Sequence, residues 1–153
     1  MARARIAIGS QRVEPLATRR FAFSDVGGVI AAIEATLVHR IIEQDSVNQA
    51  PNGVSHLVLA HVWQRQIDER AADHRRVVDL VVAGAHVHLE LGDQVRLHEV
   101  EATALEPLPS MLAALEDELG IAGLVRLESG DFAFRLDPVR LLALSRPAQE
   151  PNT

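Results

Sequence analysis

The last third of the chain carries a pattern that predicts a strand, a turn, a second strand and a helix in that order. Residues 122–127 alternate between side-chain types with the period of a β-strand, and residues 132–136 do so again. The four residues between these runs, Glu-Ser-Gly-Asp, are typical of a turn. Asp137 and Pro138 follow, at the N-cap and first positions of a helix. A chain with this ending is expected to fold mainly from closely spaced β-strands.

The composition is that of a globular chain with few aromatic side chains. Apolar residues make up 48% and charged residues 24% of the 153 residues, which suits one packed domain. Aromatic residues are only 3%, so we expect a core of Val, Leu, Ile and Ala. The net charge of −6 argues against nucleic-acid binding, and the absence of cysteine excludes disulfides and thiolate chemistry.

Alternating apolar runs predict further strands at 21–24, 29–33, 76–82, 86–91 and 94–97. Turn residues at 25–28 and 83–85 join two pairs of these strands. The apolar run 54–63 continues into residues 64–70, which we expect to wind into a short helix. Residues 34–42 have apolar positions with the spacing of a helix.

A second helix is predicted at 111–119, with Ser110 as its cap. Residues 1–14 and 146–153 are expected to be flexible tails around one domain at 15–145. The beginning of the chain has no apolar stretch typical of a signal peptide, and no window approaches the roughly 18 apolar residues of a membrane span. We therefore expect a cytoplasmic protein with no direct membrane insertion.

The ending of the chain resembles that of CheW-like domains, the scaffold modules of bacterial chemotaxis. The residues that fit the family pattern are Gly123, Leu127, Gly130, Phe132, Phe134, Leu136, Asp137, Leu141 and Leu142. In the middle of the chain, residues 77–82, Gly84, residues 91–95 and residues 107–109 are also similar to the family's series. Gly92 departs from it, because the family prefers Val or Ile there. A Gly-Asp pair alone is typical of a tight hairpin turn, whereas the resemblance implies one long strand with a bend, which we favour.

The resemblance implies a mainly β fold of two small β-barrel lobes with short helices. It also implies a strand or a short turn within 34–42, where the apolar spacing fits a helix. In function it implies a non-enzymatic adaptor that couples the cytoplasmic tips of methyl-accepting chemoreceptors to a CheA-type histidine kinase. The family's Asn-Leu-Arg-Gly segment has no counterpart between Thr36 and Gly53, so we expect at least one of the two contacts to be weaker than in typical members.

The same resemblance places a protein-binding surface at the join of the two lobes, with no catalytic residue and no cofactor. The apolar residues assigned to that surface are Ile33, Leu37, Ile41, Val87, Leu89, Leu91 and Val95. Alternation alone does not separate a groove from the interior, so some of these residues are expected in the core.

One alternative is a small metal- or ligand-binding β-barrel that uses His86, His88 and Glu90. These residues share one strand face, and two imidazoles with a carboxylate can hold zinc or iron. A solvated polar face opposite the apolar side of the strand explains them equally well, and we favour it. Asp79 is unusual in an apolar strand, and we expect it to face solvent or to neighbour Arg76. No serine lies in a G-x-S-x-G elbow, and nothing in the sequence predicts an enzyme.

Overall fold

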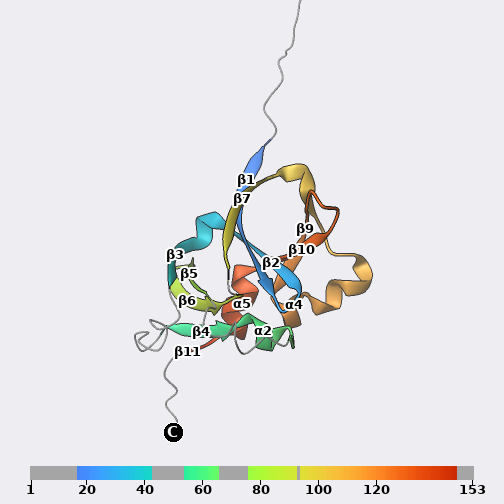
Figure 1. Ribbon diagram of the computed structural model, residues 1–153. Helices are drawn as coiled ribbons and strands as arrows, with labels where there is room; N and C mark the ends of the chain where they lie inside the picture. The colour runs from blue at the N-terminus through green and yellow to red at the C-terminus, as the bar shows by residue number, and fades with distance from the viewer. Residues whose placement is uncertain (1–16, 43–53, 66–75, 93, 148–153) are drawn as a thin grey trace, which may run out of the picture.

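The computed structural model describes residues 17–42, 54–65, 76–92 and 94–147, which form two β-sheets joined by short helices (Figure 1). The first sheet has six strands in the order β7-β1-β2-β10-β9-β8. The bounds of these strands are β1 (Thr18–Val26), β2 (Val29–Glu34), β7 (Arg96–Glu101), β8 (Leu105–Glu106), β9 (Ile121–Arg126) and β10 (Phe132–Leu136).

The second sheet has five strands in the order β11-β4-β6-β5-β3. Its strands are β3 (Val38–Ile42), β4 (Ser55–Val58), β5 (Val77–Val82), β6 (Ala85–Glu90) and β11 (Arg146–Pro147). The helices are η1 (Ala35–Leu37), α2 (Leu59–Val62), η3 (Ala102–Ala104), η4 (Ser110–Leu115), α4 (Glu116–Leu119) and α5 (Pro138–Leu144). The chain starts in the first sheet, crosses to the second at β3, returns at β7 and ends in the second at β11. Both sheets are therefore needed to complete the fold.

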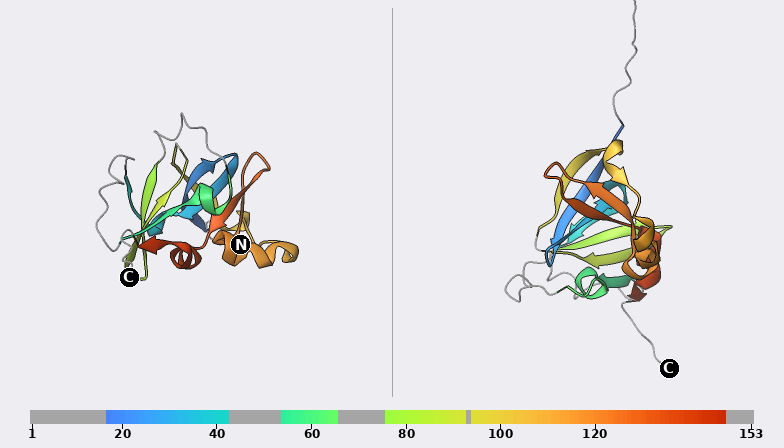
Figure 2. Two further views of the ribbon diagram at one scale, coloured as in Figure 1. Left: turned by 90° about the horizontal axis from the view of Figure 1, so that it is seen from below. Right: turned by 90° about the vertical axis from the view of Figure 1, so that its right-hand side faces the viewer.

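The first sheet curls into a half-barrel, whereas the second sheet stays open. The edge strands β7 and β8 are joined by η3 but do not pair with each other, so one side of the half-barrel is open (Figure 1). The half-barrel lies above the second sheet in the right-hand view of Figure 2. The mainly β architecture is confirmed, with one half-barrel and one open sheet in place of two barrels.

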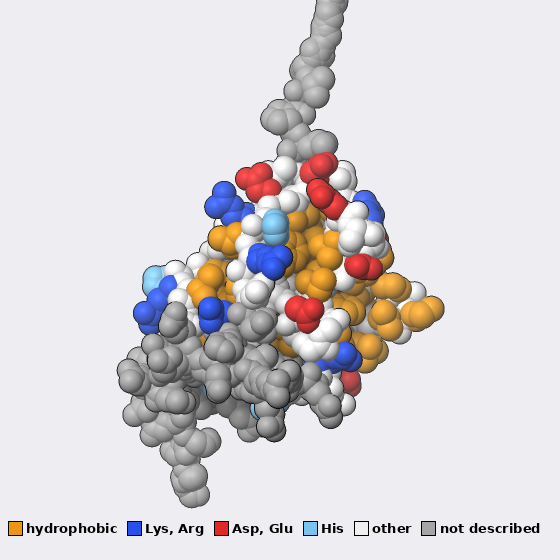
Figure 3. All heavy atoms as spheres, viewed as in Figure 1, with side chains coloured by type: hydrophobic (Ala, Val, Ile, Leu, Met, Phe, Trp, Pro, Cys, Tyr) orange, Lys and Arg blue, Asp and Glu red, His pale blue; other side chains and the backbone are white. Residues whose placement is uncertain are grey.

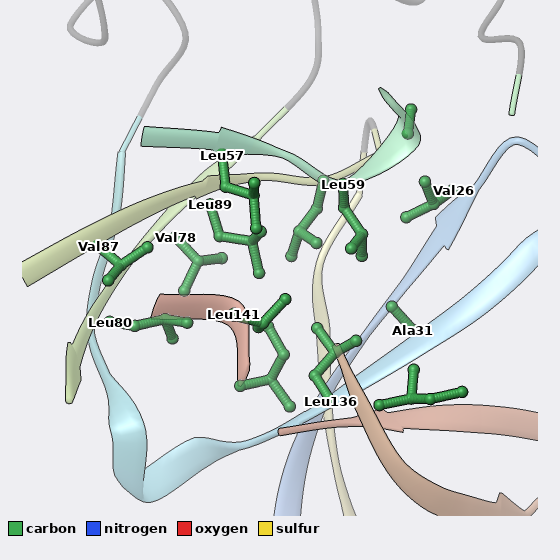
Figure 4. Close-up of a cluster of buried hydrophobic side chains, with 14 of the residues drawn as sticks. Val26, Ala31, Leu57, Leu59, Val78, Leu80, Val87, Leu89, Leu136 and Leu141 are labelled. Atoms are coloured by element: carbon green, nitrogen blue, oxygen red, sulfur yellow. The ribbon is translucent and has the colours of Figure 1, made fainter. Parts of the chain in front are cut away.

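The main core fills the space between the two sheets (Figure 4). Val26 and Ala31 from the first sheet are buried there with Leu80 and Leu89 from the second, and Leu141 of α5 is buried among them. Fully burying a side chain of this size contributes about 1.5–3 kcal/mol relative to exposure. Aliphatic residues dominate this core, as expected from the scarcity of aromatic residues.

The turns have the backbone geometry that the sequence predicts. The Asp25 carboxylate accepts a hydrogen bond from the Gly28 N–H at 2.7 Å in the β1–β2 turn. Ala83 and Gly84 both take positive φ between β5 and β6, the combination that matches the twist of a two-residue hairpin. Gly130 has φ 94° in the β9–β10 turn.

Three expectations about local structure can be compared with the structure. Residues 34–42 form the short turn η1 and strand β3, as the resemblance implies, and not a helix. The apolar run 54–63 contains a short helix, α2. A helix was predicted after this run, at 64–70, and residues 66–70 of it lie outside the described part of the chain. Ser110 is the first residue of η4, and Pro109, which has no side-chain donor or acceptor, takes the N-cap position.

The boundaries of the domain differ slightly from the prediction at the C-terminal end. The backbone of Arg146–Pro147 pairs with β4, so regular structure extends two residues beyond position 145. The predicted tail at 1–14, the first two residues of the predicted domain and residues 148–153 lie outside the described residues.

Gly92 lies where the chain passes from the second sheet to the first. Strand β6 ends at Glu90, and β7 pairs with β1 in the other sheet, so the segment is a bend between sheets and not a hairpin. A Cβ atom at Gly92 would stand 1.9 Å from the Asp25 carbonyl oxygen. The Gly92 N–H donates to the Ser24 hydroxyl oxygen at 2.9 Å. The departure from the family pattern therefore has a steric cause, because only glycine fits against β1 at this crossing.

Candidate functional site

Four of the seven residues assigned to a binding surface belong to the main core. Ile33, Val87, Leu89 and Leu91 are at most 2% exposed, so they cannot contact a partner in this structure. The prediction is wrong for these four because the apolar faces of β2 and β6 pack inward against the facing sheet.

The other three predicted residues are accessible at the margins of the sheets. Leu37 and Val95 are half-buried against the main core, and Ile41 on the edge strand β3 is 45% exposed. Leu97 on the edge strand β7 is 52% exposed, and the prediction missed it. Leu97 lies opposite Ala22 of β1 in the register. The sequence does carry a signal for Leu97, because Leu97 and Val95 are two positions apart and so share one strand face. We call Leu37, Ile41, Val95 and Leu97 the margin residues.

A second candidate site is a polar cluster on the face of the second sheet that points away from the main core. Asp79 of β5 is buried, and three cationic or ionisable side chains surround it. Its carboxylate lies 3.0 Å from His86 Nδ1, 3.6 Å from Arg40 Nε and 3.8 Å from His88 Nε2. The expectation that Asp79 faces solvent is wrong, and the side chains around its carboxylate come from the two strands that flank β5, namely β3 and β6.

The strand register brings this cluster together. Asp79 lies directly opposite His88, and Arg40 lies opposite Asp79 on the other side. His56 of β4 lies beside His88 in a parallel pair, and its Nε2 is 3.3 Å from the Glu90 carboxylate. His88 and Glu90 are both buried, so the solvated-face interpretation of this strand is wrong for these two residues.

The cluster does not assemble the predicted metal ligands at one point. His86 and His88 face Asp79, whereas Glu90 faces His56. Within the described residues, no group of three or more His, Cys, Asp or Glu side chains is arranged to hold a metal ion. The cluster therefore groups imidazole and guanidinium side chains around the buried Asp79 and Glu90 carboxylates.

Burial lowers the pKa of His88, and the nearby Asp79 carboxylate opposes that shift. His56, Arg40 and His86 lower the pKa of His88 further by electrostatic repulsion. The neutral form of His88 is therefore favoured in the folded protein, and its Nδ1 atom is buried without a hydrogen-bond partner among the described residues.

The arrangement of a half-barrel packed on a five-stranded sheet defines a fold of the CheW type. The structure is similar to the crystal structure of the scaffolding protein TtCheW from Thermoanaerobacter tengcongensis, with a TM-score of 0.60. The match covers 79% of this chain and 90% of that chain, at 9% sequence identity. No family model and no curated protein sequence matches this chain. The similarity is therefore one of fold, and it agrees with the fold that the sequence resemblance implies.

No described helix has the length and apolar character needed to cross a membrane.

Proposed function

We propose that this protein is a non-enzymatic adaptor of the CheW type that acts in the cytoplasm. It joins the cytoplasmic tip of a methyl-accepting chemoreceptor to a CheA-type histidine kinase. The observation that carries this proposal is the fold shared with a scaffolding protein over 79% of the chain. The family-like motifs at residues 77–95 and 123–142 support it independently.

The margin residues are the surface that we assign to a partner. An adaptor works by protein contacts alone, and such contacts gain free energy chiefly by burying apolar surface. Ile41 and Leu97 are exposed on edge strands of different sheets, so a partner that covered both would touch both lobes. Contact with both lobes makes binding depend on the assembled fold and not on one isolated strand.

The test is a titration of the full chain with the regulatory domain of the cognate kinase and, separately, with a receptor cytoplasmic fragment. Leu97→Ser and Ile41→Ser should each weaken at least one interaction about tenfold, since an exposed apolar anchor contributes roughly 1–3 kcal/mol to binding. Val139→Ser is the matched control, because Val139 is an exposed apolar residue of α5, remote in sequence from the margin residues. If the folded protein binds neither partner, the adaptor proposal is wrong.

The missing family segment should also weaken at least one of the two contacts. The family's Asn-Leu-Arg-Gly segment has no counterpart between Thr36 and Gly53, so we expect at least one of the two partners to bind more weakly than it binds typical family members. The same titrations, run beside a family member that carries the segment, measure this difference, and binding of both partners as tight as that member's would contradict the inference from the missing segment.

The metal-binding alternative predicts a different result in the same protein preparation. We expect elemental analysis of protein purified without chelators to find no stoichiometric zinc, iron or copper, because His86 and His88 are already paired with Asp79. One tightly bound equivalent that is lost in the His86→Ala/His88→Ala variant would favour the alternative.

A further inference from the structure

The interior of the half-barrel is not filled by its own side chains. A hollow of about 1060 Å³ lies between strands β1 and β7 on one side and the end of β9 on the other. Figure 3 shows hydrophobic side chains within this region, with charged side chains around them. Ligand pockets in proteins commonly enclose roughly 300–1,000 Å³, and small barrels are either filled by side chains or hold one small ligand.

Small residues on the floor of the half-barrel help to explain why the hollow exists. A small second core is formed by Phe21, Ala32, Val125 and Ala133, all fully buried. Two of these four are alanines, which leave space that larger aliphatic residues would occupy. Partly buried apolar residues continue from this floor into the hollow, namely Phe23, Ile30, Val100 and Leu127.

The strand register places two basic side chains on this inner face. Arg96 lies opposite Phe23, and His98 lies opposite Phe21, so both share the face that lines the hollow. The His98 and Phe23 rings are 5.9 Å apart. The Arg96 guanidinium donates to the Gln94 side-chain oxygen at 2.7 Å, and no carboxylate of the described residues lies within ion-pair distance of it. Arg96 can therefore still bind an anion.

The carboxylates around the hollow are less well placed to neutralise Arg96. Asp25 already accepts the Gly28 N–H, and Glu128 lies beyond the end of β9. Glu99 and Glu101 also line the hollow, but on β7 they alternate with Arg96, His98 and Val100, and Glu99 lies 3.8 Å from Arg20 of β1. The remaining cation, Arg126, is paired with Glu106.

We propose that this hollow binds an amphipathic small molecule with an aliphatic body and one anionic head group. The aliphatic body would lie on Phe23, Ile30 and Val100, and the head group would meet Arg96 at the mouth. A medium-chain carboxylate has this chemistry. The proposal is independent of the adaptor function, because it uses the inner face of the half-barrel and not the margin residues.

The experiment is isothermal titration calorimetry of the full chain with three probes, decanoate, decanol and decyltrimethylammonium, each kept below its micelle concentration or its solubility limit. Decanoate should bind most tightly, decanol about tenfold more weakly because it lacks the charge, and the cation most weakly. If decanoate does not bind, or if the cation binds as tightly as decanoate, the proposal is overturned.

Two matched pairs of variants locate the site. Arg96→Gln should weaken decanoate binding about tenfold and leave decanol binding unchanged, whereas Arg20→Gln on the outer face should affect neither. Val100→Trp should fill the hollow and abolish binding of both probes, whereas Leu97→Trp on the opposite face of β7 should not. Circular dichroism checks that each variant is folded; should Val100→Trp fail to fold, the Arg96→Gln comparison decides, and unchanged decanoate affinity there overturns the proposal.

Discussion

At the scale of single residues, Gly92 is the position with the least freedom to change. The carbonyl oxygen of Asp25 occupies the place where a Cβ atom would stand, and backbone cannot move aside as a flexible side chain can. We expect Gly92→Ala to lower the free energy of unfolding by about 3 kcal/mol, at the upper end of overpacking costs. Urea unfolding followed by circular dichroism measures this change.

Gly84→Ala is the matched control for this substitution. Gly84 has φ 83° but open space around it, so alanine there meets backbone strain without a clash. That strain should cost about 1 kcal/mol. A Gly92→Ala variant that is as stable as Gly84→Ala would show that the crossing between the sheets can relax.

His88 should make the stability of the protein depend on pH. Burial lowers the pKa of His88 in the folded state below its ordinary value of 6.5, so the unfolded chain binds more protons just below that pH. Stability is then fully present above pH 6.5 and is lost as the pH falls through the lowered pKa of the folded state. Urea unfolding between about pH 7.5 and about pH 5.5 should show this loss, and His88→Gln should reduce it. Parallel pH curves for the two proteins would contradict this assignment.

At the scale of elements, α5 depends on its N-cap residue, Asp137, and on one arginine. The Asp137 carboxylate accepts hydrogen bonds from the N–H groups of Val139 and Arg140 at 2.9 and 3.2 Å. The Arg140 guanidinium also lies 2.7 Å from Asp137 and 2.8 Å from Asp117 of α4, which ties the two helices together. Asp137→Ala should cost about 1–2 kcal/mol of stability, whereas Asp137→Ser should retain most of the cap. Thermal unfolding compares the two variants, and equal losses would show that the hydrogen-bonded cap is not the cause.

Elements with strong local signals were predictable from the sequence, and those decided by packing were not. The β9–β10 hairpin and the Asp137 cap were predicted because turn residues and a capping side chain act within a few positions. Helix α2 was not predicted, because residues 54–63 form one apolar run; its Leu59 and Ala60 are buried in the main core, where tertiary packing decides the local structure. Four predicted surface residues proved to be core for a related reason, since alternation identifies an apolar face but not what covers it.

The sequence predicted only part of the polar cluster. His86, His88 and Glu90 share a strand and could be grouped by their spacing. His56 and Arg40 come from other strands, and only the pairing of β4 with β6 and of β3 with β5 brings them into the cluster. Contacts between strands that are distant in sequence are set by sheet order, which local patterns do not specify.

At the scale of the whole molecule, the two lobes share one main core and should unfold together. Trp63, which follows α2, donates its ring N–H to the Leu119 carbonyl oxygen at 2.9 Å and packs edge-on against Phe134 of the first sheet. Its fluorescence therefore reports the junction between the lobes, whereas far-ultraviolet circular dichroism reports the strands of both. We expect the two signals to give one coincident transition in urea.

A core substitution on the second sheet tests the same cooperativity. Leu89 is fully buried between the sheets, so Leu89→Ala should lower the unfolding free energy by about 3 kcal/mol. If the sheets fold as one unit, both signals shift to lower urea by the same amount, although the substituted residue lies in only one sheet. Separate transitions, with part of the circular dichroism signal unmoved by Leu89→Ala, would show that the half-barrel holds its structure independently. In that case the two lobes could separate while each stays folded. Binding that uses margin residues of both lobes would then weaken at a lower urea concentration than the one at which the strands unfold.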